Sequence, residues 1–187
     1  MEKIITCPHC KTQFDMSVKP SKTSSKYLWI FDNGHGGLID GVYQTQGKRS
    51  PEWPDGNILY EGEFNRSIVN RLMKMCNSNG IDAVNLVDTP VDISLRERVN
   101  SANKIAKSSE KPCIYVSVHA NGFSDESANG WEVFTSQGET KSDEIATVLL
   151  EKAEAEFPNY KMRKDTRDGD VDKESNFYVL INTSMPA

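Results

Sequence analysis

Apolar residues along this chain of 187 residues follow two patterns, which predict two kinds of element. Short continuous apolar runs bounded by turn residues predict buried strands. Such runs occupy residues 27–32, 81–87, 113–119, 130–134 and 177–181. Apolar residues spaced three or four positions apart predict three helices, beginning near Glu63, Leu95 and Lys141. Strands that alternate with helices predict an α/β fold, an open, mostly parallel twisted sheet with helices on both faces.

Each predicted helix has boundary signals and an expected buried face. Asn79-Gly80 is typical of a helix C-terminus, and Ser94 followed by Glu97 forms a capping box at the start of the second helix. The residues expected to face the core are Phe64, Ile68, Leu72 and Met75, with Val69 and Met73 widening that face, then Leu95, Val99, Ala102, Ile105 and Ala106, and finally Ile145, Val148, Leu149 and Ala153.

The chain divides into a short N-terminal segment, a linker and one main domain. Residues 1–20 contain Cys7 and Cys10 in a CxxC motif, which is half of a zinc ribbon without the second cysteine pair. We interpret this segment as a small knuckle whose cysteines hold a second zinc ion, stay free or form a redox pair. Residues 21–26 are rich in serine and lysine and predict a linker, and residues 27–187 form the main domain.

Composition and charge exclude some classes of function. The net charge is −5, and an acidic chain is poorly suited to neutralising nucleic-acid phosphates. No apolar run is long enough for a transmembrane helix, and the first residues lack the apolar region of a signal peptide. We therefore expect the protein to be made in the cytoplasm and to act elsewhere only after release or transfer.

Two of the three histidines follow predicted strands. His35 lies between glycines after the first run, and His119 ends the run at 113–119. The carboxyl ends of parallel strands meet at one sheet edge, and imidazole is a common metal ligand. A carboxylate would complete a His₂Glu zinc set. Glu61 and Glu63 compete for this role, and Glu63 is favoured by its place in the expected first turn of the helix.

Two long polar segments flank these elements. Residues 38–60 carry Tyr43, Trp53 and Tyr60, which either stack on a ligand or anchor the loop to the core. Residues 158–173 carry charges of both signs, a pattern typical of a solvated loop.

Several motifs occur in a fixed order: GHGG at 34–37, a glutamate before FNRSIVNRL, SLRERVNSAN, YVSVHANG and GWEVF. In this order and spacing the region from Tyr27 to Ala187 resembles the zinc-dependent N-acetylmuramoyl-L-alanine amidases of the amidase-3 family. The resemblance implies a phosphorylase/hydrolase-like fold. It also implies zinc-dependent hydrolysis of the amide between N-acetylmuramic acid and L-alanine in peptidoglycan. It places zinc on His35, Glu63 and His119, and it gives substrate-side positions to Asn121 and Glu132.

The resemblance has several departures, and the most serious lies at the end of the chain. The family's general-base glutamate follows a stretch like Met185-Pro186-Ala187, so we expect that residue beyond Ala187 and a catalytic domain that is C-terminally incomplete. The 187-residue form is then expected to be weak or inactive. The alternative is a module that keeps the zinc fold and binds the cell wall or an interaction partner without efficient catalysis.

Overall fold

The computed structural model describes residues 4–6, 13–15, 25–122, 129–167 and 169–187. Near the N-terminus, β1 (Ile4–Thr6) and β2 (Gln13–Asp15) pair antiparallel. Cys7 and Cys10 lie outside the described residues, so the second zinc site stays a prediction.

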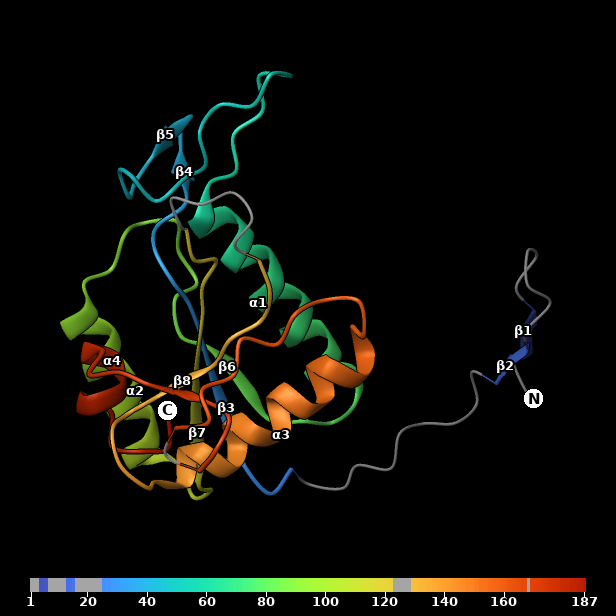
Figure 1. The fold of residues 1–187 in the computed structure, drawn as a ribbon, viewed down its shortest axis with the longest axis vertical. Coiled ribbons are helices and arrows are strands. Elements are labelled where there is room, and N and C mark those ends of the chain that lie inside the picture. Colours follow the sequence, from blue (N-terminus) through green and yellow to red (C-terminus); the bar gives the residue numbers. More distant parts are fainter. Residues whose placement is uncertain (1–3, 7–12, 16–24, 123–128, 168) are drawn as a thin grey trace.

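A parallel sheet of three strands forms the centre of the main domain (Figure 1). Its order is β6 (Ala83–Asn85), β3 (Leu28–Asn33) and β7 (Cys113–Val118), and β3 pairs parallel with both neighbours. All three strands therefore end at the same edge, as the sequence predicted. The open parallel sheet is confirmed.

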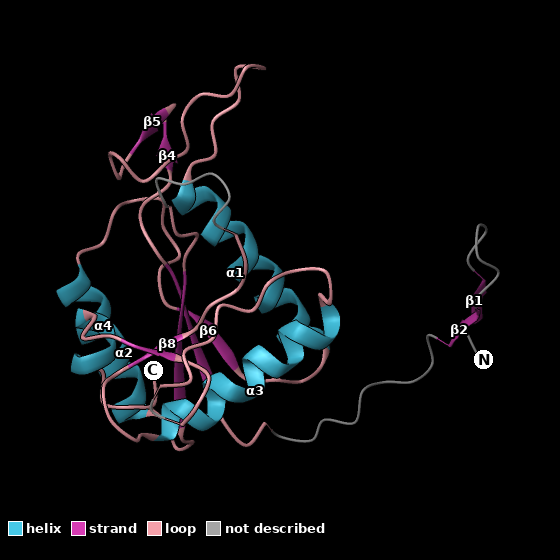
Figure 2. Cartoon of the chain, viewed as in Figure 1, coloured by secondary structure: helices cyan, strands magenta, loops and turns pink. Residues whose placement is uncertain are grey.

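Helices cover both faces of this sheet (Figure 2). On one face, α1 (Glu61–Ser78) packs Val69 and Cys76 against Phe31 of β3. On the other, α2 (Leu95–Ser108) packs Ala102 against Ile30, with the short helix α4 (Tyr178–Asn182) beside it. Because successive side chains of a strand point to opposite faces, Ile30 and Phe31 belong to two separate apolar clusters.

The remaining elements lie around this core. The segment after β3 forms a small antiparallel hairpin of β4 (Leu38–Ile39) and β5 (Val42–Tyr43). Further along, β8 (Phe134–Thr135) pairs parallel with β9 (Lys173–Glu174), and α3 (Lys141–Glu156) lies between them in sequence. Among the described residues, no helix is both long enough and apolar enough to span a membrane.

One predicted strand is wrong. Residues 177–181 were expected to be extended, but the chain forms α4 there and packs Val179 against the Ile30 cluster. A five-residue apolar run has no periodicity that separates a short strand from a single helical turn. The predicted strand at 130–134 is also shorter than expected, because only Phe134 of that run belongs to β8, while Trp131 forms an isolated bridge with Met162.

The predicted helix faces were only partly right. Phe64 and Met75 of α1 are 40% and 62% exposed, and Leu95, Val148 and Leu149 are exposed as well. The fully buried positions of α1 instead include Asn65, which is polar. Amphipathic periodicity misplaced this face because polar residues occupy its first turns.

A buried ion pair ties α2 to the end of β3. The Arg98 guanidinium donates to a carboxylate oxygen of Asp32, and both side chains are almost fully buried. The other carboxylate oxygen of Asp32 accepts from the Tyr115 hydroxyl at 2.5 Å. Arg98 also donates to the backbone carbonyl oxygens of Asn33 at 2.9 Å and His35 at 3.4 Å. Burial and the charge of Asp32 raise the pKa of Tyr115 far above its ordinary value, so its hydroxyl remains a donor.

We expect the Arg98→Met substitution to lower the free energy of unfolding by about 3–5 kcal/mol, because it leaves the Asp32 carboxylate buried without its counter-charge. Urea unfolding followed by circular dichroism measures this change. Arg96→Met is the matched control, since Arg96 is an exposed residue on the same helix. Equal stability losses in the two variants would contradict the proposed importance of the buried pair.

Candidate metal centre

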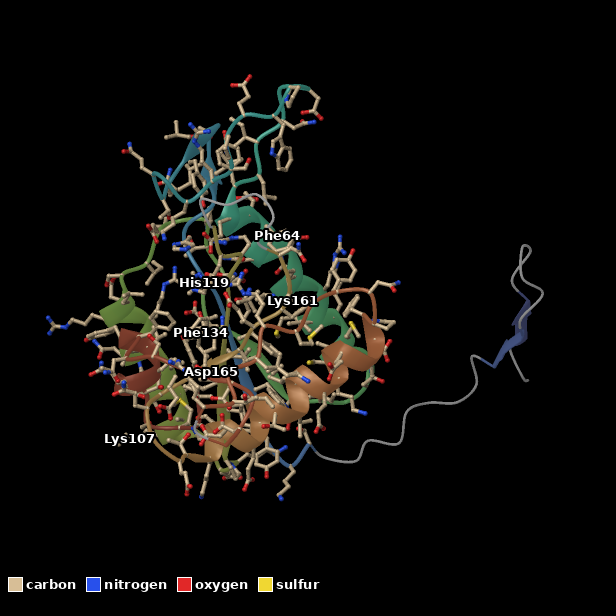
Figure 3. The ribbon with its side chains drawn as sticks, in the orientation of Figure 1. Phe64, Lys107, His119, Phe134, Lys161 and Asp165 are labelled. Carbon is tan, nitrogen blue, oxygen red and sulfur yellow. The ribbon has the colours of Figure 1, made fainter. Side chains whose placement is uncertain are left out.

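His35 and His119 lie together at the carboxyl edge of the sheet. His35 follows β3 and His119 follows β7, the neighbouring strand. Their rings meet edge to face, with centroids 4.8 Å apart. Figure 3 shows His119 near the half of α1 on which Phe64 is labelled. The pairing that the strand ends predicted is therefore present in the structure.

Glu61, the first residue of α1, joins the two histidines. Its Oε1 atom lies 3.2 Å from His35 Nε2 and 3.0 Å from His119 Nδ1. The same oxygen accepts a hydrogen bond from the backbone N–H of Ala120 at 3.1 Å. One carboxylate thus connects the start of α1 with the segments that follow two strands.

The backbone around the histidines is unusually close-packed. His35 itself has a left-handed backbone conformation, with φ of 69°. A Cβ atom on Gly34 would lie 2.2 Å from the His119 ring, and one on Gly62 would lie 1.8 Å from the carbonyl oxygen of Gly36. Asn65 fixes the same loop by donating from Nδ2 to the Gly34 carbonyl oxygen at 3.0 Å. Glycine at position 34 therefore leaves room for the His119 ring, and glycine at position 62 lets α1 approach the histidine loop.

The geometry of these three side chains suits a metal ion. One potential ligand atom from each of His35, Glu61 and His119 lies within 4.8 Å of the others. Two imidazoles and a carboxylate form a common zinc ligand set that leaves a fourth position open. The side chains of His35 and Glu61 are 17% and 11% exposed, whereas that of His119 is 40% exposed. The group is therefore accessible from the side of His119.

Charge at the centre favours an ionised carboxylate. Burial alone would raise the pKa of Glu61, but hydrogen bonds with His119 and His35, and the charges of those rings, lower it well below its ordinary value. Glu61 therefore stays negatively charged over the whole neutral range, as a metal ligand must.

The structure corrects the predicted third member of this group, which is Glu61 and not Glu63. The Oε1 atom of Glu63 instead accepts a hydrogen bond from the backbone N–H of Leu38 at 2.7 Å and so holds the start of the β4–β5 hairpin. The helix begins two residues earlier than expected, and two residues are separated by about 200° around a helix. The spacing of Glu61, Asn65 and Val69 on one helix face could have identified Glu61.

Asn121 and Glu132, the two predicted substrate-side residues, are in direct contact. Asn121 Nδ2 donates to Glu132 Oε1 at 2.6 Å. Glu132 Oε2 lies 2.6 Å from Lys173 Nζ and 3.1 Å from Arg163 Nε. Burial alone would raise the pKa of Glu132, but hydrogen bonds from Lys173 and Asn121 and the charges of Lys173 and Arg163 lower it. Sequence reasoning missed both cations, because they come from the segment interpreted as a solvated loop.

The aromatic residues of the long loop have different roles. The Tyr43 hydroxyl donates to the Lys48 carbonyl oxygen and accepts from the Gly62 N–H, both at 2.9 Å, and its ring lies 4.7 Å from that of Tyr60. These two tyrosines anchor the loop to the start of α1. Trp53 is exposed.

Comparison with known proteins gives consistent matches. Residues 30–187 match the Amidase_3 family model, described as N-acetylmuramoyl-L-alanine amidase. The chain is 31% identical over 160 residues to the amidase LytC of Bacillus subtilis, covering 84% of this chain and 27% of that protein. It is 28% identical over 134 residues to the amidase AmiA of Salmonella typhimurium, covering 72% of this chain and 41% of that protein. The chain thus spans less than half the length of these two relatives.

Solved structures give the same result. The crystal structure of an N-acetylmuramoyl-L-alanine amidase from Clostridium difficile 630 superposes with a TM-score of 0.64 at 25% sequence identity. This match covers 88% of the present chain and 77% of the other.

Separate substitutions of Glu61 and Glu63 by glutamine test which of them is the metal ligand. We expect Glu61→Gln to weaken binding of a divalent transition metal by about 100-fold or more, because a neutral amide is a poor replacement for a ligand carboxylate. Glu63→Gln is the matched control and should bind the metal as the unchanged protein does. Competition titration with a chromogenic chelator measures both affinities. Equal losses in the two variants would contradict the assignment of Glu61.

Proposed function

The chain belongs to the amidase-3 family of N-acetylmuramoyl-L-alanine amidases, and on this premise we propose that it hydrolyses the amide between N-acetylmuramic acid and L-alanine in peptidoglycan. The observation that carries the proposal is the group formed by His35, Glu61 and His119 at the carboxyl edge of the sheet. Family membership over residues 30–187 supplies the substrate class. Access to the cell wall through release or transfer stays a prediction.

The metal in this proposal is Zn²⁺, held by His35, Glu61 and His119. The donor set fits, because two imidazoles and one carboxylate converge with one accessible side. When bound, zinc supplies a Lewis acid for the amide carbonyl and lowers the pKa of water to about 7.

The chain's own residues set the geometry for this chemistry. Glu61 contacts both imidazoles with one oxygen, so it fixes their separation and contributes a negative charge. Arg98 donates to the carbonyl oxygens of Asn33 and His35 and so fixes the loop that carries the first imidazole. The more exposed side of His119 leaves room for the substrate to enter. Such positioning, rather than flexibility, is the contribution that catalysis requires of these groups.

For Asn121 and Glu132 we propose a role in positioning the substrate. Asn121 is two residues from His119 in sequence, and its hydrogen bond to Glu132 fixes the orientation of both side chains. Lys173 and Arg163 hold Glu132 in its ionised form. The four side chains thus offer a preorganised polar surface to an amide-rich substrate.

The first test measures the bond that is cleaved. Zinc-loaded protein is incubated with purified peptidoglycan, and newly formed L-alanine amino groups are quantified. Release is expected, with loss of at least about 100-fold in Glu61→Gln and little change in Glu63→Gln.

Two results would reject this proposal or replace it. No release of amino groups by the zinc-saturated protein would contradict amidase activity. Binding to peptidoglycan without release would instead favour the alternative that the sequence left open, a module that binds the cell wall without cleaving it.

A second test concerns the substrate-side pair. We expect Asn121→Ala to lower kcat/KM by about tenfold, the equivalent of one lost hydrogen bond, while the zinc content stays unchanged. Asn77→Ala, at an exposed position of α1, is the control and should retain full activity. Unchanged kcat/KM in Asn121→Ala would remove this residue from the substrate site.

A further inference from the structure

A second group of carboxylates lies outside the metal centre. Asp143 is in the first turn of α3, and Asp170 and Asp172 immediately precede β9. One oxygen from each of the three lies within 4.8 Å of the others. Asp165, labelled in Figure 3, lies in the same segment between α3 and β9. The sequence had indicated a solvated loop at this place.

Asp172 does not behave as a residue of a solvated loop, because it is fully buried, with 0% of its surface exposed. Its Oδ2 atom accepts a hydrogen bond from the Thr135 hydroxyl at 2.5 Å. Its Oδ1 atom is also buried and has no hydrogen-bond partner within the described part of the chain. A buried carboxylate oxygen without a partner is costly, so the position of this atom indicates a ligand that the described part of the polypeptide does not provide.

In the portion of the chain that the structure describes, neither Asp143 nor Asp172 forms an ion pair with lysine or arginine. Lys173, the residue after Asp172, pairs with Glu132 instead, and Lys164 pairs with Glu154. Neighbouring carboxylates repel one another when both are ionised, unless a cation lies between them.

Asp143 is held in place by its own helix. It is the N3 residue of the capping box that begins at Thr140, and its carboxylate accepts from the Thr140 backbone N–H and hydroxyl at 2.5 Å and 3.0 Å. Both donors are neutral groups, so these hydrogen bonds add no full positive charge beside the carboxylates. The capping box thus holds the Asp143 carboxylate near Asp170 and Asp172 without an ionic partner for Asp143 among the described residues.

We propose that Asp143, Asp170 and Asp172 together bind one Ca²⁺ ion. All three donors are carboxylate oxygens, which hard cations prefer, and the group contains no histidine or cysteine that would favour zinc. Calcium takes six to eight oxygen ligands, often from several carboxylates, whereas magnesium keeps several waters and is usually bound through only one or two carboxylates. A group of three carboxylates therefore suits calcium better than magnesium.

The site would join α3 to the segment that leads into β9. In that strand the Lys173 N–H donates to the Val133 carbonyl oxygen at 2.9 Å, and the Lys173 side chain pairs with Glu132. Bound calcium therefore stabilises the strand that presents Lys173. This inference is independent of the amidase proposal, because it rests on none of the residues of the metal centre.

Thermal unfolding with and without calcium tests the site. Protein dialysed against the calcium chelator EGTA is measured alone, with CaCl₂ and with MgCl₂. At a calcium concentration about 100 times Kd, the Tm should rise by about 5–10 °C, and isothermal titration should give one ion per chain. Asp172→Asn should lose this rise, yet unfold at the same or a higher Tm without calcium, because it removes a buried unpaired charge.

Two further variants complete the design. Asp143→Asn keeps an acceptor for the capping box but lacks the ligand charge, so it should also lose the calcium-dependent rise, even if Asp172→Asn fails to fold. Glu144→Gln removes an exposed charge from the neighbouring position and should keep the full rise. The proposal is overturned by an absent rise in the unchanged protein, by equal rises in all variants, or by a response to magnesium instead of calcium.

Discussion

The buried pair of Arg98 and Asp32 is the constraint on which the rest of the site depends. It connects α2 to the end of β3, three residues before His35. Tyr115 of the neighbouring strand β7 donates a hydrogen bond to the same Asp32 carboxylate. Because a buried charge without a partner is costly, the pair favours the arrangement in which α2, β3 and β7 bring these groups together. The same ion pair also fixes the loop that carries His35, because Arg98 donates to the backbone carbonyl oxygens of Asn33 and His35.

The edge of the sheet carries polar groups that a core built for stability alone would lack. Glu61 and Asn65 occupy the inner face of α1, where leucine or valine would pack better. Asn33 and Asn65 each bury a side-chain oxygen that has no partner among the described residues. Such exceptions are typical of functional sites, where chemistry replaces packing as the requirement. The two apolar clusters on either side of β3 offset the cost in stability of burying these polar groups.

These same exceptions explain which features could be predicted from sequence. The central strands and the capping box of α2 follow local rules, and both are present. Helical phasing of α1 failed because it assumes that apolar residues mark the inner face, while Glu61 begins that face. The helix at 178–182 depends on packing against α2 rather than on its own pattern. Burial of Asp172 is a tertiary effect that charge patterning along the chain does not contain.

Gly62 is a position where one added side chain would change the spacing between α1 and the loop that carries His35. It follows Glu61 directly, and the carbonyl oxygen of Gly36 occupies the space that a side chain would take. Any larger residue at position 62 would push the first turn of α1 away from the loop that carries His35, even though the helix itself would still form. Substitution at this position is therefore restricted, because a side chain larger than hydrogen would move Glu61 away from His35 and His119.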